Sequence, residues 1–126
     1  MIVGIGCDVV DHLMTRKLNW STNFRVQKRI FSVKEIDLSL SHDHKTDRFF
    51  SGRFAVKEAV LKCLGTGMRD GIALTDIQVL QTVTGQPFIE IEGEIKRISE
   101  QMGIVNWHVS ISHTDNSTCA FVVAEK

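Results

Sequence analysis

The segment RFAVKEAVLKCLG, residues 53–65, decides the fold of this chain, because it has the pattern of a helix with apolar residues nearly all round. At 100° per residue its alanines, valines, leucines, Phe54 and Cys63 cover most of the circumference. Gly65 supplies a stop signal, so the pattern predicts a helix over residues 48–64. A helix of this composition is normally buried, and we expect this one to be buried too.

Four charged residues interrupt this apolar helix in two stacked pairs, Arg53 with Lys57 and Glu58 with Lys62. Residues four apart are neighbours on a helix, so such pairs are usually surface salt bridges or like-charge neighbours on a solvated face. Here the polar face is too narrow for that interpretation. Buried charge is costly unless it is paired or bound to an ion. The pattern therefore favours a functional site.

Residues 2–10, IVGIGCDVV, are typical of a strand. Side chains alternate across a strand, so one face carries Val3, Ile5, Cys7 and Val9 and the other carries Gly4, Gly6 and Asp8. The two glycines leave room for something to approach the backbone. Asp8 either caps the next helix or pairs with Glu58. Two carboxylates, with phosphate oxygens and water, are the usual protein share of a Mg²⁺ site, and nearby Arg53, Lys57 and Lys62 would then hold the phosphates.

The rest of the chain alternates between helical and strand patterns. Residues 12–30 indicate a helix in two pieces broken near residues 21–23, Ser32 and Glu35 have capping-box spacing that starts a helix at Val33, and residues 41–47 have loop composition. Later elements are a hairpin over 77–83 and 87–91, a helix over 94–102 followed by Gly103, and strands over 107–112 and 119–124. The hairpins predict an α+β fold with a small antiparallel sheet packed with helices, in a single domain spanning residues 1–126.

Several shorter motifs allow two interpretations. The glycines of GTG at 65–67 either end the helix or let backbone N–H groups reach a phosphate. The string HVSISH at 108–113 offers a Ser/His pair, but strand alternation alone produces such a string. His42 and His44 are either metal ligands or ordinary residues of a solvated loop, and the composition of the loop favours the second interpretation. The three widely spaced cysteines fit neither a disulfide framework nor a zinc site.

Charge is uneven along the chain although the net charge is zero. Residues 1–62 hold eleven Lys/Arg and seven Asp/Glu, and residues 63–126 hold four and eight. This balance argues against a nucleic-acid binder, and no apolar run is long enough to span a membrane. Without a secretory signal pattern, cytoplasmic residence is expected. The basic residues of the first helical region either form a solvated face or a docking surface for an acidic partner: Arg16, Lys17, Arg25, Lys28 and Arg29.

Together these motifs resemble the holo-acyl-carrier-protein synthase family of phosphopantetheinyl transferases. The resemblance runs from IVGIGCDVV through KRIF at 28–31 and GRFAVKEAVLKCLGTG at 52–67 to GQP at 85–87 and HVSISH. Phe54, Lys57, Glu58, Ala59 and Lys62 match the family pattern F-x-x-K-E-A-x-x-K. Departures occur at Asp11, at Thr118-Cys119 and over residues 18–23, and they bear on carrier-protein docking.

The resemblance implies a homotrimer with active sites at subunit interfaces, which moves 4′-phosphopantetheine from coenzyme A to a serine of an acidic apo-acyl carrier protein, in support of fatty acid biosynthesis. Asp8 and Glu58 would hold Mg²⁺, and Glu58 and Lys62 would act in catalysis. Carrier docking would fall to Arg16, Arg25, Lys28 and Arg29, and coenzyme A would contact Arg53, Lys57, Lys62, Gly65, Thr66 and His108. The alternatives are a Mg²⁺-dependent coenzyme A or nucleotide pyrophosphatase and a binding module without activity.

Overall fold

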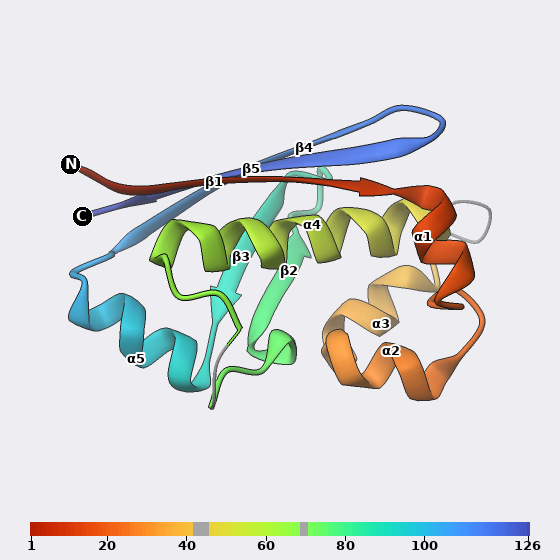
Figure 1. Cartoon of the computed structure of the whole chain (residues 1–126), viewed down its shortest axis with the longest axis horizontal. Coiled ribbons are helices and arrows are strands. Elements are labelled where there is room, and N and C mark those ends of the chain that lie inside the picture. The colour runs from red at the N-terminus through yellow and green to blue at the C-terminus, as the bar shows by residue number, and fades with distance from the viewer. Residues whose placement is uncertain (42–45, 69–70) are drawn as a thin grey trace.

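The structure, a computed structural model, describes residues 1–41, 46–68 and 71–126 (Figure 1). Its elements in chain order are β1 (Ile2–Asp11), α1 (His12–Lys17), α2 (Phe24–Ile30), α3 (Val33–Ser39), α4 (Thr46–Leu64), the 3-10 turn η1 (Leu74–Asp76), β2 (Ile77–Gln81), β3 (Pro87–Ile91), α5 (Gly93–Gln101), β4 (Asn106–His113) and β5 (Ser117–Glu125).

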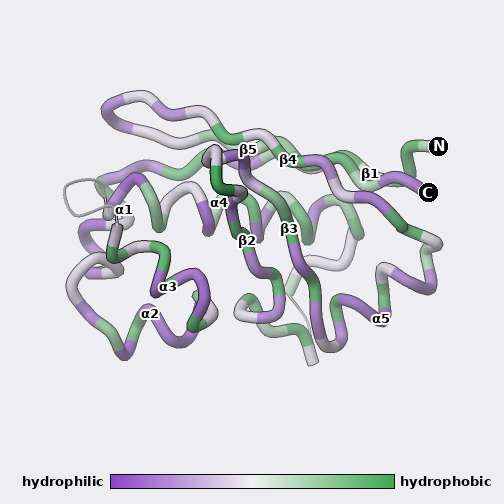
Figure 2. The backbone as a smooth tube through the Cα atoms, turned by 180° about the vertical axis from the view of Figure 1, so that it is seen from behind, coloured by the Kyte–Doolittle hydropathy of each residue, from purple (hydrophilic) through white to green (hydrophobic). Residues whose placement is uncertain are grey.

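Two antiparallel units of sheet flank helix α4. Strand β5 lies between β1 and β4 and pairs antiparallel with both, while β2 and β3 pair as a separate hairpin. The long helix α4 runs along one face of the β1-β5-β4 sheet, with α1 to α3 gathered at one end and α5 at the other (Figure 1). Seen from behind, the β2–β3 hairpin lies across α4 between these two groups (Figure 2). The predicted antiparallel α+β fold is confirmed.

Helix α4 forms the centre of the main core. Thirteen of its nineteen residues are buried, which confirms the prediction of a buried helix. Four of its apolar side chains are fully buried and pack against inward-facing residues of β5, including Ala120. These four residues are Ala55, Val56, Ala59 and Val60. The helix begins at Thr46, two residues earlier than predicted, and ends at Leu64 before Gly65, whose φ is +71°.

Gly4 and Gly6 allow strand β1 to lie directly against helix α4. A Cβ atom at Gly4 would stand 2.3 Å from the carbonyl oxygen of Cys63, and one at Gly6 would stand 1.9 Å from that of Ala59. Both distances are impossible contacts, so only glycine fits at either position. What approaches the backbone at these glycines is therefore the protein's own helix, and Asp8, two residues on, falls on the same side of the strand.

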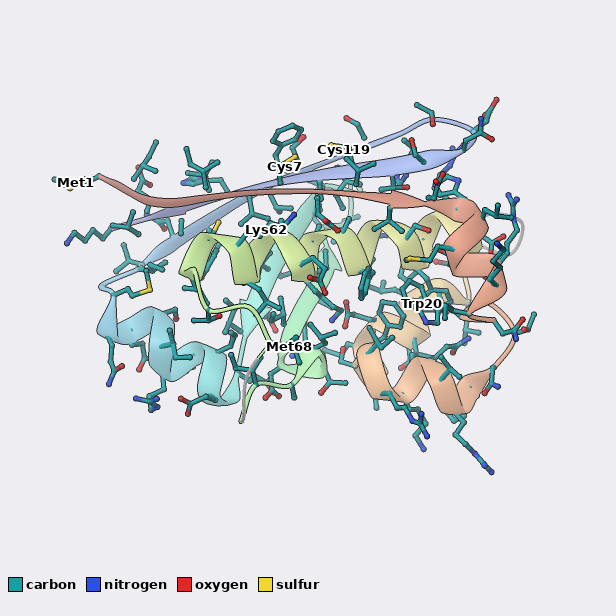
Figure 3. All side chains as sticks on the ribbon, viewed as in Figure 1. Met1, Cys7, Trp20, Lys62, Met68 and Cys119 are labelled. Carbon is teal, nitrogen blue, oxygen red and sulfur yellow. The ribbon has the colours of Figure 1, made fainter. Side chains whose placement is uncertain are left out.

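A second, aromatic cluster joins α1, α2 and α3 to the first half of α4. Trp20 and Phe31 meet edge to face with ring centroids 5.6 Å apart, and Phe31 meets Phe50 at 4.7 Å. Trp20 is labelled in Figure 3 where it lies between these helices. Because Trp20 is 2% exposed and Phe31 and Phe50 are each 1% exposed, this cluster fixes the helical end of the molecule to the helix that carries Glu58.

The remaining predicted elements agree with the structure in type. The break between α1 and α2 spans residues 18–23, and the capping box predicted at Ser32 and Glu35 is present. Thr46 and Asp47, predicted as loop, belong to α4. His42 and His44 lie outside the described residues. Within the described part of the chain, none of the helices is both long and apolar enough to cross a membrane.

Candidate active site

Asp8, Glu58 and Lys62 meet at the seam between strand β1 and helix α4. Lys62 Nζ donates to Asp8 Oδ1 at 3.2 Å and to the backbone oxygen of Cys7 at 2.8 Å. Figure 3 shows Lys62 on α4 just below the strand that carries Cys7. Asp8 has 19% of its side chain exposed and Lys62 has 54%, so the cluster is open to solvent on one side. Asp8 does not cap α1, because the N-cap position belongs to Asp11.

Glu58 lies near enough to Asp8 for the two negative charges to interact. Partial burial and the negative charge of Asp8 raise the pKa of Glu58, in that order of importance, and the positive charge of Lys62 partly offsets them. Two carboxylates facing one another are unfavourable unless a cation lies between them or a proton is taken up. The structure thus brings together the two acidic residues predicted from the sequence and sets a cation, Lys62, beside them.

This carboxylate pair suits a divalent cation that keeps other ligands. Among the described residues, no group of three or more His, Cys, Asp or Glu side chains could enclose a metal ion by itself. Mg²⁺ commonly takes only one or two carboxylates and completes its octahedron with water and substrate phosphates. Asp8 and Glu58 would hold such an ion, with Lys62 beside the phosphates. The carboxylate oxygens of Asp8 and Glu58 are therefore suitable ligands for the Mg²⁺ that the sequence predicts.

Lys57 does not take part in this cluster. Its side chain has no exposed surface, and Nζ donates to Glu35 Oε1 at 2.7 Å, to the Leu74 carbonyl oxygen at 2.9 Å and to that of Ile77. An ammonium has three donors, and these acceptors use all of them. The structure therefore argues against the prediction that Lys57 binds a phosphate. Lys57 instead joins α4 to α3 and β2.

Arg53 is buried but incompletely satisfied. One guanidinium nitrogen donates to Gln81 Oε1 at 3.0 Å, and the group lies 4.0 Å from the centroid of Phe49. Its Nε is one of two buried side-chain polar atoms in the described residues that lack a hydrogen-bond partner, and the other is Thr66 Oγ1. Burial lowers the pKa of Arg53 to about 10, against the opposing effect of Glu35. Unpaired buried donors of this kind are suited to an incoming anion.

The predicted residues of the helix end stay close to Lys62, whereas His108 does not. Gly65 and Thr66 follow the last residue of α4, and nothing lies within 4 Å of a Cβ built at Gly65. His108 pairs in register with Val123, on the outer face of the sheet, and its Nε2 lies 3.1 Å from Glu125 Oε1. Within one chain the sheet separates His108 from α4, so a single chain does not bring it together with Arg53.

His113 and Arg48 are near Arg53 and were not among the predicted site residues. Partial burial is the largest effect that lowers the pKa of His113, to about 4, and the positive charges of Arg48, His12 and Arg53 follow in that order. His113 belongs to the same HVSISH string as His108 and lies on the opposite face of β4 by alternation. Knowing which face of β4 covers α4 would have selected His113 over His108.

The predicted docking residues all lie on exposed helix surface. Arg16 on α1 pairs with Asp47 at 2.9 Å, and Lys28 on α2 lies 5.0 Å from the ring centroid of Phe24. Phe24 is 59% exposed and borders a cavity of about 270 Å³ between α2 and α3. An exposed aromatic ring among cations gives this surface the mixed apolar and basic character expected for docking an acidic partner. The residues are Arg16, Arg25, Lys28 and Arg29.

On its outer face, the β1–β5 part of the β1-β5-β4 sheet is apolar and uncovered in the single chain. Ile5 is 65% exposed, Val9 is 64% exposed and Phe121 is 53% exposed. The register places Val9 opposite Cys119 and Cys7 opposite Phe121 on this same face, and Figure 3 shows Cys7 and Cys119 side by side there. A contiguous apolar sheet face of this kind is typical of an interface.

Comparison with known proteins identifies the family. A model of the 4′-phosphopantetheinyl transferase superfamily matches residues 4–122. The holo-[acyl-carrier-protein] synthase of Hydrogenovibrio crunogenus is 40% identical over 125 residues, covering 99% of this chain and 98% of the relative. The enzyme of the same name from Escherichia fergusonii is 34% identical over 124 residues and covers 98% of both chains.

Solved structures agree with the sequence matches. The holo-[acyl-carrier-protein] synthase of Neisseria meningitidis superposes with a TM-score of 0.87 at 32% identity, over 100% of both chains. That of Bacillus anthracis, in complex with CoA (3′,5′-ADP), gives 0.80 at 30% identity over 98% and 96% of the chains. That of Helicobacter pylori, in complex with coenzyme A, gives 0.82 at 26% identity over 96% and 99%. The chain therefore belongs to the 4′-phosphopantetheinyl transferase superfamily and, within it, to the holo-[acyl-carrier-protein] synthase family.

Proposed function

We propose that this chain transfers 4′-phosphopantetheine from coenzyme A to a serine hydroxyl of apo-acyl carrier protein, with Mg²⁺ held by Asp8 and Glu58. The carrying observation is the meeting of these two carboxylates with Lys62 at the β1–α4 seam, in a member of a family named for this reaction. Related structures that contain coenzyme A support the donor. We assign the chain to cytoplasmic fatty acid biosynthesis on the same family grounds.

The reaction is a phosphoryl-type transfer. The serine Oγ forms a bond to the phosphorus that carries pantetheine, the bond from that phosphorus to the bridging pyrophosphate oxygen breaks, and adenosine 3′,5′-bisphosphate leaves. Asp8 and Glu58 would hold the Mg²⁺, which would neutralise charge on the pyrophosphate and polarise the phosphorus. Glu58, or a water molecule beside it, receives the serine proton. Lys62, whose side chain is 54% exposed, offsets the negative charge that develops on the leaving side.

The other residues proposed to contact coenzyme A are spread along helix α4 and the residues that follow it. Arg53 and the helix end at Leu64 are separated by eleven residues, or about 17 Å at 1.5 Å per residue. Their unpaired atoms, Arg53 Nε and Thr66 Oγ1, are therefore too far apart to hold one phosphate. We propose that Arg53 contacts a nucleotide phosphate and that Gly65 and Thr66 border the region near Lys62, either on one long ligand or on two copies of the site.

A homotrimer would cover the uncovered sheet face and complete the site. Ile5, Val9 and Phe121 form an apolar surface whose exposure in a single chain is unfavourable. His108 lies on that outer face and could approach a neighbouring copy's site, which is the one arrangement that retains its predicted contact with coenzyme A. Active sites at the subunit interfaces follow from this arrangement. The acidic carrier protein would dock on α1 and α2 through Arg16, Arg25, Lys28 and Arg29.

Mass spectrometry of apo-carrier protein tests the reaction class. Incubation with this protein, coenzyme A and Mg²⁺ should add the mass of one phosphopantetheine to the carrier, and removal of Mg²⁺ with a chelator should abolish the gain. A parallel incubation without carrier protein measures hydrolysis. If coenzyme A is consumed in the incubation without carrier protein, and the carrier gains no mass in the first incubation, the protein is a pyrophosphatase and the transferase is refuted.

A further inference from the structure

A chain of hydrogen bonds links His12 on α1 to His113 on β4 through the hydroxyl of Thr118 on β5. His12 Nε2 lies 2.8 Å from Thr118 Oγ1, and His113 Nδ1 lies 2.8 Å from the same oxygen. His12 Nδ1 lies 3.1 Å from the backbone oxygen of Asp115. His12 is 3% exposed and Thr118 is fully buried, so water does not substitute for these contacts.

The chemistry of the groups fixes the direction of every bond in this chain. A carbonyl oxygen only accepts, so His12 Nδ1 must carry a proton and donate to Asp115. In a neutral imidazole the other nitrogen is then an acceptor, and His12 Nε2 accepts from the Thr118 hydroxyl. That hydroxyl has one proton and has already used it. Thr118 Oγ1 must therefore accept from His113, whose Nδ1 carries the proton.

The opposite order requires a charged His12. An imidazolium would donate from both nitrogens, and Thr118 would then donate to His113 Nδ1. That charge would be buried, with a carbonyl and a hydroxyl rather than a carboxylate as the hydrogen-bond partners of His12. Burying a charge without an opposite charge beside it is costly. The carboxylate of Asp115 is fully exposed and lies 3.8 Å from Arg48 instead. The other groups that act on His113 are the cations Arg48 and Arg53 of α4.

We infer that His12 and Thr118 are positioning residues, which hold His113 as its Nδ1–H tautomer and leave Nε2 as the nitrogen that a ligand beside Arg53 meets. Nε2 has no hydrogen-bond partner among the described residues. It presents a lone pair when His113 is neutral, and it can take up a proton without breaking the chain. The low pKa of His113, about 4, agrees with a neutral ring at pH 7.

The same contacts join helix α1 to the surroundings of His113. His12 is the first residue of α1, which also carries the proposed docking residue Arg16. Thr15, one turn after His12, shares a hydrogen bond of 2.5 Å with Ser51 of α4. Only the meaning of this tautomer for ligand binding rests on the proposed function. The tautomer itself is a property of the free protein, so a failed transfer reaction and a failed inference are distinguishable.

Nitrogen-15 NMR of the histidine rings in the free, unliganded protein at pH 7 tests the inference. We expect His113 to show a pyrrole-like Nδ1 and a pyridine-like Nε2. In His12→Leu the acceptor for Thr118 is gone, its hydroxyl turns to His113 Nδ1, and His113 should change to the Nε2–H form. His12→Gln keeps an acceptor near the position of Nε2 and should restore the wild-type pattern.

A second pair of variants addresses the hydroxyl. Thr118→Val removes it with little change of volume, and His113 should become a mixture of both tautomers. Thr118→Ser keeps the hydroxyl and should behave as wild type. A wild-type His113 in the Nε2–H form would overturn the inference even if every variant failed to fold. An unchanged Nδ1–H form in folded His12→Leu or Thr118→Val protein would overturn it as well.

Discussion

Lys57 Nζ and Glu35 Oε1 lie 2.7 Å apart in an ion pair with no exposed surface on either side chain. Glu35 also accepts from the backbone N–H of Ser32 and, through Oε2, from that of Val79. A single carboxylate thus caps α3, holds an edge of β2 and neutralises a lysine of α4. The first lysine of the K-E-A pattern is therefore part of the scaffold, whereas Glu58 next to it is the residue proposed to act in the reaction.

Removing the charge of Glu35 should destabilise the protein strongly. In Glu35→Gln the Lys57 ammonium stays buried without its partner, a change that typically costs about 3–5 kcal/mol. Burial already lowers the pKa of Lys57 and Glu35 opposes that effect. The variant's folded state therefore binds fewer protons than its unfolded state at high pH, so its stability should rise with pH. Urea unfolding at several pH values measures both effects.

The double variant Glu35→Gln/Lys57→Met is the matched control, because it removes the buried charge altogether. It should recover most of the lost stability, since neutral replacements of buried ion pairs are often tolerated. Equal unfolding midpoints for Glu35→Gln and wild type would show that the pair contributes nothing to stability. Transfer activity of the double variant, if it folds, should remain, because Lys57 contacts no substrate.

Replacing Gly6 by alanine should separate β1 from α4. The new Cβ would stand 1.9 Å from the Ala59 carbonyl oxygen, so the strand has to move away from the helix. Asp8 moves with the strand, and we expect transfer activity to fall at least tenfold along with the melting temperature. In the control Gly52→Ala, the nearest atom is 3.4 Å from the new Cβ and belongs to His113, so the melting temperature is the readout to compare between the two variants. Similar losses in both variants would refute the close-approach explanation.

Much of this architecture was predictable because it depends on local sequence. The Ser32–Glu35 capping box, the Gly65 stop and the two glycines of β1 were all recognisable by spacing alone. The second role of Glu35, as partner of Lys57, joins residues 22 positions apart. No sequence periodicity encodes that contact. The sequence therefore could not show that Lys57 is buried in an ion pair whereas Lys62, on the same helix, is exposed.

The candidate site was predictable only as far as a family pattern and strand alternation reach. Alternation divides HVSISH into two sets of side chains but does not say which set faces α4. His108 was the histidine predicted to contact coenzyme A, whereas Ile111 packs against the core and thereby places His113, two residues on, on the helix side. The meeting of Asp8 with Lys62 depends on the β1–α4 contact across 54 residues. The residue types offered it as one of two interpretations of Asp8, and the resemblance favoured it.

Glu58 should make the metal-free protein less stable at neutral pH. Burial and Asp8 raise its pKa, so the folded state binds more protons than the unfolded state between the two pKa values, and stability falls as pH rises through that window. Glu58→Gln cannot ionise and should unfold at a higher urea concentration than wild type when a chelator is present. Mg²⁺ with coenzyme A should stabilise wild type and leave the variant unchanged. A lower midpoint for the metal-free variant would contradict this account.

Charge reversal on α2 should weaken carrier docking selectively. Arg25→Glu/Lys28→Glu should raise KM for the acidic carrier protein at least tenfold, mainly through association rate, with KM for coenzyme A little changed. The effect should shrink as salt increases. Lys96→Glu/Arg97→Glu on α5 reverses two charges at the other end of the molecule and should leave both values near wild type. An unchanged carrier KM in the α2 variant would remove α2 from the docking surface.

Substitution on the outer sheet face should break the proposed trimer. Ile5→Glu places a charge where a neighbouring copy would bury an apolar side chain, and sedimentation should show monomers at micromolar concentration. Val83→Glu alters an equally apolar, fully exposed residue at the β2–β3 turn and should remain trimeric. A wild-type protein that sediments as a monomer would refute the trimer directly.

The metal role of Asp8 and Glu58 is the centre of this account, and electron paramagnetic resonance of bound Mn²⁺ in the presence of coenzyme A measures it most directly. Wild type should bind one Mn²⁺ per chain, Mg²⁺ should displace it, and Asp8→Asn and Glu58→Gln should each weaken binding at least tenfold while Glu100→Gln binds normally. Wild-type Mn²⁺ affinity in folded Asp8→Asn and Glu58→Gln proteins would contradict the assignment of both carboxylates.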